Sequence, residues 1–119
     1  MSPDAAIASL DRQLAKHGQD AVLRRRHQDG AQMSNIDVSA RVSFRGYRPD
    51  EIAGGIYQGD SEVVLSATQL KAEGWPSGEW EVPKVGDQII VAGRARSILA
   101  VAPIYIGSAL VRIDLQVRG

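Results

Sequence analysis

Two histidines are the side chains best suited to acid–base or metal chemistry in this chain, His17 and His27. Neither belongs to an HExxH motif or another metal-spaced pair, and no third ligand can be assigned to either. His17 follows Lys16 at the expected end of a helix, where a cation complements the helix dipole. His27 follows three arginines and fits a solvated strand face. We therefore predict no catalytic histidine and no metal site.

Serine, carboxylate and glycine motifs are the other routes to catalysis or phosphate binding. No serine lies in a GxSxG elbow. The acidic residues at 50–51 and 60–62 follow a proline and a glycine, as ordinary turn formers do. Gly54-Gly55 fits neither the GxxxxGK[ST] nor the GxGxxG pattern. Because the chain has no cysteine, disulfides and thiolate metal sites are excluded. The sequence predicts neither an enzyme nor a cofactor.

Charge also limits the partners that the chain can attract. The 14 basic and 14 acidic residues cancel, which argues against bulk electrostatic binding of nucleic acid or an anionic membrane. Arg24-Arg25-Arg26 is the one charge run. On a strand, consecutive side chains alternate between faces, so only Arg24 and Arg26 can share one. We read the run as a solvated face or as ion pairs between subunits, and incidental contact with packaged DNA stays an alternative.

A short helix is predicted over residues 1–18. Ser2-Pro3-Asp4 provides a cap, a first-turn proline and an acidic residue at the positive end of the dipole. Ile7, Leu10 and Leu14 recur at helical spacing. A helix of this length is marginal alone, so its apolar stripe must dock on another surface. We predict that these three residues contribute to a protein interface.

From residue 20 onward the apolar period changes to two, which is typical of strands. Strands are predicted over 21–27, 38–45, 62–70, 88–91, 96–101 and 111–117. This pattern predicts a mainly β fold, a small barrel or sandwich of five to six antiparallel strands over residues 20–118. The alternation predicts a core of Val38, Val42, Phe44, Val63, Leu65, Ile89, Val91, Ile98, Val111, Ile113, Leu115 and Val117.

Two long loops interrupt the strand pattern, residues 46–61 and 71–86. Each is far longer than a hairpin loop, and loops of that length are usually functional or disordered. They contain four of the six aromatic residues of the chain, which is typical of contact surfaces. We predict that these loops supply a protein interface through Tyr47, Tyr57, Trp75 and Trp80.

The 119 residues suit a single domain, 1–119. The first twenty residues contain no long apolar run, and nowhere do eighteen apolar residues follow one another. We therefore expect neither a signal peptide nor a membrane span.

The layout of nearly the whole chain resembles the phage head–tail joining proteins, also called head-completion or stopper proteins. The matching features are the helix up to His17-Gly18, the strand over 20–27 and the long loop 46–61. The run Val85–Gly93 followed by Ser97–Val101 is similar to that family's hairpin, in which a Gly-Asp turn precedes two apolar strands.

The resemblance implies a non-catalytic virion protein that completes the head and joins it to the tail. It implies a monomer before assembly and a homo-oligomeric ring after it, in contact with portal or adaptor proteins and with tail proteins. The expected location is the head–tail junction of a virion assembled in the bacterial cytoplasm. Two alternatives stay open: a tail-terminator or tail-completion protein, and a small nucleic-acid-binding β-barrel.

Overall fold

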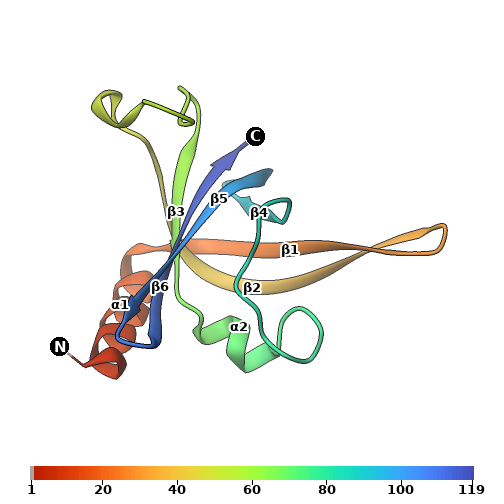
Figure 1. The fold of residues 1–119 in the computed structure, drawn as a ribbon, viewed down its shortest axis with the longest axis horizontal. Coiled ribbons are helices and arrows are strands. Elements are labelled where there is room, and N and C mark those ends of the chain that lie inside the picture. Colours follow the sequence, from red (N-terminus) through yellow and green to blue (C-terminus); the bar gives the residue numbers. More distant parts are fainter. Residues whose placement is uncertain (1) are drawn as a thin grey trace.

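Six antiparallel strands close into a barrel in the computed structural model, which describes residues 2–119. Around the barrel the strand order is β1-β2-β3-β6-β5-β4 (Figure 1). The mainly β fold with an N-terminal helix is thus confirmed, as a barrel. In chain order the elements are α1 (Pro3–His17), β1 (Gln19–Asp29), β2 (Gln32–Gly46), the 3-10 turn η1 (Pro49–Glu51), β3 (Ser61–Leu65), α2 (Thr68–Glu73), β4 (Gln88–Val91), β5 (Arg94–Ile106) and β6 (Ala109–Arg118).

Helix α1 begins and ends as the sequence predicts. The Ser2 hydroxyl accepts a hydrogen bond from the backbone N–H of Ala5 at 3.1 Å. At the other end, the Gly18 N–H donates to the Leu14 carbonyl at 2.9 Å. Gly18 has an extended φ of −81°, so its role is spatial: an added Cβ would lie 2.7 Å from the Val42 carbonyl oxygen. A glycine lets the helix end lie directly against β2.

Arg41 on β2 joins the end of α1 to the barrel. Its guanidinium donates to the carbonyls of Leu14, Ala15 and Gly18 at 2.8–3.2 Å. A cation there adds hydrogen bonds to the carbonyls at the helix end, including the Leu14 carbonyl that already accepts the Gly18 N–H, and it complements the dipole. Leu14 is buried, and α1 lies against β2 and β6. The predicted apolar stripe is therefore docked on the outer wall of the barrel.

Two hairpins extend beyond the closed part of the barrel (Figure 1). β1 and β2 pair along their whole length, but β4 pairs with β1 only over residues 21–24, and β3 pairs with β2 only over 42–46. Residues 25–36 thus form a two-stranded projection, the β1–β2 arm. Likewise β4 pairs with β5 only over 94–97, which leaves the far half of the β5–β6 hairpin outside the closed barrel.

Three predicted boundaries are wrong by more than two residues. The strand predicted over 96–101 continues to Ile106, because the end of the β5–β6 hairpin pairs beyond the closed barrel. β2 begins at Gln32 and not at Val38, because the arm is exposed on both faces and its residues need no apolar alternation. The strand predicted over 62–70 ends at Leu65, and α2 follows it. Ser66 causes the change: its hydroxyl accepts the Thr68 N–H at 3.2 Å, a local turn that replaces strand pairing.

The barrel core contains all the predicted core residues except Phe44 and Val111. Phe44 is half-buried, and the guanidinium carbon of Arg96 lies 4.6 Å from the centre of its ring. The register of β6 shifts near Val111, so Leu110 enters the core and Val111 is buried beside α1 instead. The core also takes up residues that the alternation missed: Ala21, Leu23, Ala40, Ala67, Leu70 and Trp75.

Among residues 2–119, no helix is long and apolar enough to cross a membrane.

Candidate functional site

The two histidines lie apart. His17 is the last residue of α1, just before β1 begins, whereas His27 lies exposed near the far end of β1, opposite Ser34 on the β1–β2 arm. Within the part of the chain that the structure describes, no three His, Cys, Asp or Glu side chains gather where they could hold a metal ion.

Asp60 lies at the centre of a buried polar cluster. Its carboxylate accepts two hydrogen bonds from Arg118, at 2.6 and 2.8 Å, one from the Gln116 amide at 2.9 Å, and one from the Tyr57 N–H at 3.0 Å. The Arg118 guanidinium, more than the other donors, holds the pKa of Asp60 well below its usual range. Gln116 also donates to the Gly55 carbonyl at 3.0 Å. The carboxylate thus fastens the loop over 47–60 to the end of β6.

The other acidic pair, Asp50-Glu51, belongs to the 3-10 turn of the same loop. Glu51 accepts two hydrogen bonds from Arg45, at 2.9 and 3.1 Å, and one from the Arg48 N–H at 2.8 Å. Hydrogen bonding to Arg45, helped by the Arg48 N–H, lowers the pKa of Glu51 to about 2. The carboxylates that the sequence reads as turn formers therefore stabilise the loop.

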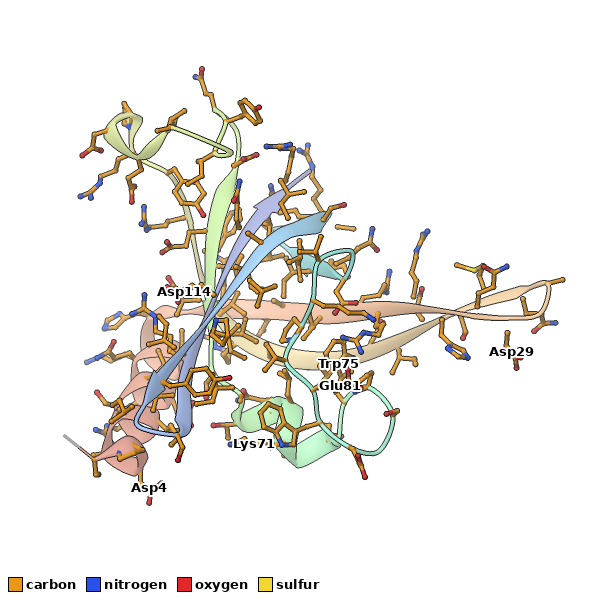
Figure 2. All side chains as sticks on the ribbon, viewed as in Figure 1. Asp4, Asp29, Lys71, Trp75, Glu81 and Asp114 are labelled. Carbon is orange, nitrogen blue, oxygen red and sulfur yellow. The ribbon has the colours of Figure 1, made fainter. Side chains whose placement is uncertain are left out.

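A second buried carboxylate, Asp87, fastens the other long loop. It accepts two hydrogen bonds from Arg25, at 3.0 and 2.9 Å, and the Lys84 N–H at 2.9 Å. Arg25 also donates to Glu81 at 2.8 Å, and its guanidinium carbon lies 4.8 Å from the centre of the Trp75 ring. Trp75 and Glu81 lie beside the base of the β1–β2 arm (Figure 2). This cluster fixes the loop over 74–87 against the arm.

The arginine run is largely neutralised inside the chain. Arg24 forms two hydrogen bonds with Asp37, at 2.9 and 3.0 Å, and Arg25 pairs with Asp87 and Glu81. Of these three arginines, Arg26, exposed on the arm, is the one for which the structure shows no ion pair within residues 2–119. The arginine run therefore presents one unpaired cation to a polyanion instead of three. Contact with DNA stays a prediction.

The predicted interface residues fall into two groups. Trp75 is 2% exposed, and its indole N–H donates to the Ile36 carbonyl at 2.9 Å, so it is a core residue and not part of a contact surface. Leu14 is likewise buried within the fold, and Ile7, Leu10 and Tyr47 are half-buried. Tyr57 and Trp80 are exposed, at 61% and 37%. These two keep the predicted contact role.

Sequence reasoning missed an exposed apolar surface at the end of the β5–β6 hairpin. Ile104, Tyr105 and Ile106 are 38%, 53% and 36% exposed, and we call these three residues the apolar tip. Ala102 and Pro103 beside them are also exposed. The signal in the sequence was the run of nine nonpolar residues over 98–106, which does not alternate with polar residues as the other strands do.

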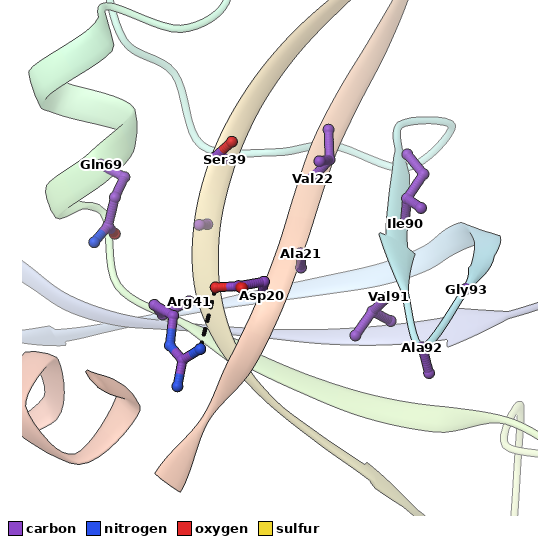
Figure 3. A pocket seen from close by; sticks show the side chains of 11 residues that line it. Asp20, Ala21, Val22, Ser39, Arg41, Gln69, Ile90, Val91, Ala92 and Gly93 are labelled. Carbon is purple, nitrogen blue, oxygen red and sulfur yellow. Dashed lines mark hydrogen bonds and ion pairs between the residues drawn. The ribbon is translucent and has the colours of Figure 1, made fainter. Parts of the chain in front are cut away.

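A shallow hollow of about 680 Å³ lies on the outer wall formed by β1, β2 and β4 (Figure 3). Its floor includes Val22 and Ile90, which face each other across the β1–β4 pair and are half-buried. Ser39 lies opposite Val22 on β2, and Gln69 of α2 borders the hollow on one side. Asp20 and Arg41 supply its charges and pair with each other at 3.1 Å. We call this surface the outer-wall hollow.

In comparisons with known proteins, no family model matches the chain and no curated protein matches it.

Proposed function

We propose that this chain is a structural subunit of a homo-oligomeric ring at the head–tail connector of a tailed phage or prophage, where it completes the head and joins it to the tail. The observation that carries the proposal is the solvent-accessible surface of the chain, which is larger than that of a compact monomer of the same mass. The chain exposes 6960 Å², whereas a compact monomer of this mass exposes about 6,300 Å². The difference, about 700 Å², approaches what one partner buries in a standard protein–protein interface, about 800 Å².

The radius of gyration also shows that the chain is less compact than a typical domain of its length. Its radius of gyration is 14.5 Å, against about 13.5 Å for a compact domain of this length. The two projecting hairpins account for the excess (Figure 1). A hairpin that projects from a barrel can reach a neighbouring subunit, which suits a chain that assembles into a ring.

The layout agrees with the head–tail joining proteins that the sequence resembles. A helix packs on a six-stranded barrel, and long loops follow the second and third strands. The buried polar groups of both loops serve the loops themselves, which suits a protein whose work is contact rather than chemistry. The nucleic-acid-binding alternative receives less support, because Arg24 and Arg25 are already paired.

An in vitro complementation assay tests the proposal. Filled heads and free tails are prepared from a lysate that lacks this chain and mixed with the purified protein, and infectious particles are counted. We expect the wild-type chain to restore the titre. We also expect it to bind isolated portal rather than tail tube; binding to tail tube alone would identify a tail terminator instead. No restored titre, together with saturable binding of DNA at low salt in a filter assay, would favour the nucleic-acid-binding barrel.

A matched pair of variants locates the contact. Tyr57→Ser with Trp80→Ser removes two exposed aromatic residues from the loops, and we expect the titre to fall about tenfold or more because such residues are enriched at interface hot spots. Met33→Ser removes an equally exposed apolar side chain from the β1–β2 arm and should leave the titre unchanged. Full titres from the double variant would contradict the role of the loops in joining.

A further inference from the structure

The apolar tip is the most concentrated exposed apolar surface that the structure shows. Three consecutive residues, Ile104, Tyr105 and Ile106, keep 38%, 53% and 36% of their surface exposed. On a strand, consecutive side chains alternate between faces, so Ile104 and Ile106 share one face of the hairpin and Tyr105 lies on the other. Single exposed apolar side chains are common, but exposed apolar side chains on both faces of one hairpin end favour an interaction site there.

The tip is suited to binding through its side chains and not by adding a strand. Over residues 100–106, β5 has only β6 beside it, so one of its edges is free. Pro103 lies in the middle of this edge strand and has no N–H to donate. A proline at such a position opposes strand addition. The partner must then offer a concave apolar surface.

The outer-wall hollow is such a surface. Its volume of about 680 Å³ falls in the range of pockets that take up a compact apolar ligand, roughly 300–1,000 Å³. Val22 and Ile90 provide apolar contact on its floor, and Ser39 presents only a hydroxyl.

The charges on the two surfaces match. Asp20 and Arg41 neutralise each other at the hollow. Next to the tip, Arg112 lies opposite Ile104 and pairs with Asp114 at 2.6 Å. Each surface is therefore neutral as a whole, and the whole chain has a formal net charge of zero. Two copies can bring these surfaces together without burying an unpaired charge, whereas a polyanionic partner would gain little from either surface.

The tip and the hollow lie far apart in one chain. Gly93, on the border of the hollow, directly precedes β5, and the tip ends that strand. Thirteen residues of strand span roughly 40 Å. The tip also lies beside α1, away from the turn between β4 and β5 (Figure 1). A projection and a recess on different parts of one subunit form a head-to-tail contact, and head-to-tail contacts close into rings when the rotation permits.

We infer that the apolar tip of one copy docks in the outer-wall hollow of the next copy, and that this contact joins neighbours in the ring. The inference rests on the proposed function, because it takes a second copy of this chain as the occupant. It adds the two surfaces that meet and their head-to-tail direction.

Cross-linking between single-cysteine variants tests this contact, and the absence of natural cysteines removes background. Tyr105→Cys is placed in the tip and Ser39→Cys in the hollow. The two purified proteins are mixed with bismaleimidoethane, and covalent heterodimers are measured over time. Met33→Cys mixed with Ser39→Cys is the matched control, since Met33 is 57% exposed and Tyr105 is 53% exposed. We expect the tip–hollow pair to cross-link about tenfold faster, because contact raises the effective concentration of the two thiols.

A chain that carries both Tyr105→Cys and Ser39→Cys should give a ladder of multimers, since each copy then has one donor and one acceptor surface. Equal rates for the tip–hollow pair and the Met33 control would overturn the inference. So would a doubly substituted chain that stops at dimers, because that result requires a symmetric contact. Neither outcome touches the proposed function, which the complementation titre decides separately with the wild-type chain.

Discussion

The β1–β2 arm and the β5–β6 hairpin share a geometry and differ in composition. Both are two-stranded projections beyond the closed barrel. The β1–β2 arm carries mainly polar side chains at its end, from Arg26 to Asn35, with Met33 as its exposed large apolar residue. The β5–β6 hairpin ends in the apolar tip. A polar projection is compatible with water and with loose contacts, whereas an apolar one at the same kind of position requires a partner.

The bases of the two hairpins are fastened in the same way. A long loop ends in a buried aspartate, Asp87 in one case and Asp60 in the other. Each aspartate accepts the N–H of the residue three positions before it and two hydrogen bonds from an arginine on the hairpin strand, Arg25 or Arg118. An isolated two-stranded hairpin is marginally stable. The loops therefore stabilise the bases, and the ends are left to bind.

The largest expected effect concerns the base of the β1–β2 arm. Trp75→Ala should lower the free energy of unfolding by about 3–5 kcal/mol, because it empties a buried indole site and removes the stacking surface for Arg25. Trp80→Ala is the matched control: this exposed tryptophan contacts Lys71 at 4.9 Å and should cost under about 1 kcal/mol. Urea titration of both variants measures the difference. Equal costs would mean that the loop over 74–87 is not fixed through Trp75.

The base of the β5–β6 hairpin should be sensitive to pH through Asp60. Asp60→Asn removes a carboxylate that accepts four hydrogen bonds, and we expect a loss of about 2–3 kcal/mol at neutral pH. Because the pKa of Asp60 is lower in the folded chain than in the unfolded one, its contribution is complete above the unfolded value. That value is about 3.9, so the contribution fades as the pH falls below roughly 4.

Urea unfolding curves of wild type and Asp60→Asn, recorded between neutral and acid pH, measure this contribution. The difference in the free energy of unfolding between the two proteins should stay constant down to about pH 5 and become smaller below about pH 4. Asp29→Asn, at the exposed turn of the other hairpin, is the control, and its free energy of unfolding should equal that of wild type across the same pH range. A difference between wild type and Asp60→Asn that grows toward acid pH would contradict the assignment of the stabilising charge to Asp60.

The two hairpins also show which parts of the fold can be predicted from the sequence and which cannot. Alternation located all six strands and most of the core, because those strand residues have one face in the core and one in water, and the capping residues located the ends of α1. It failed where a strand leaves the core: residues 32–35 are exposed on both faces, and residues 102–106 are apolar throughout, so neither segment alternates. Aromatic content drew attention to the two loops, but no local pattern separates buried Trp75 from exposed Trp80. That difference depends on Arg25 and Ile36, which are distant in the sequence.

The smallest expected effect on folding is at the apolar tip, and it sharpens the comparison most. Ile104→Ser with Tyr105→Ser should change the free energy of unfolding by about 1 kcal/mol or less, because Tyr105 is 53% exposed and Ile104 is 38% exposed. The same double variant should reduce association between copies, since it removes apolar area that only a neighbour can bury. Sedimentation velocity over a range of concentrations, alongside urea titration, measures the two quantities together. Met33→Ser on the polar arm should change neither one. A tip variant that unfolds far more easily than wild type would show that Ile104 and Tyr105 stabilise their own barrel, and the two hairpins would then differ in packing rather than in binding.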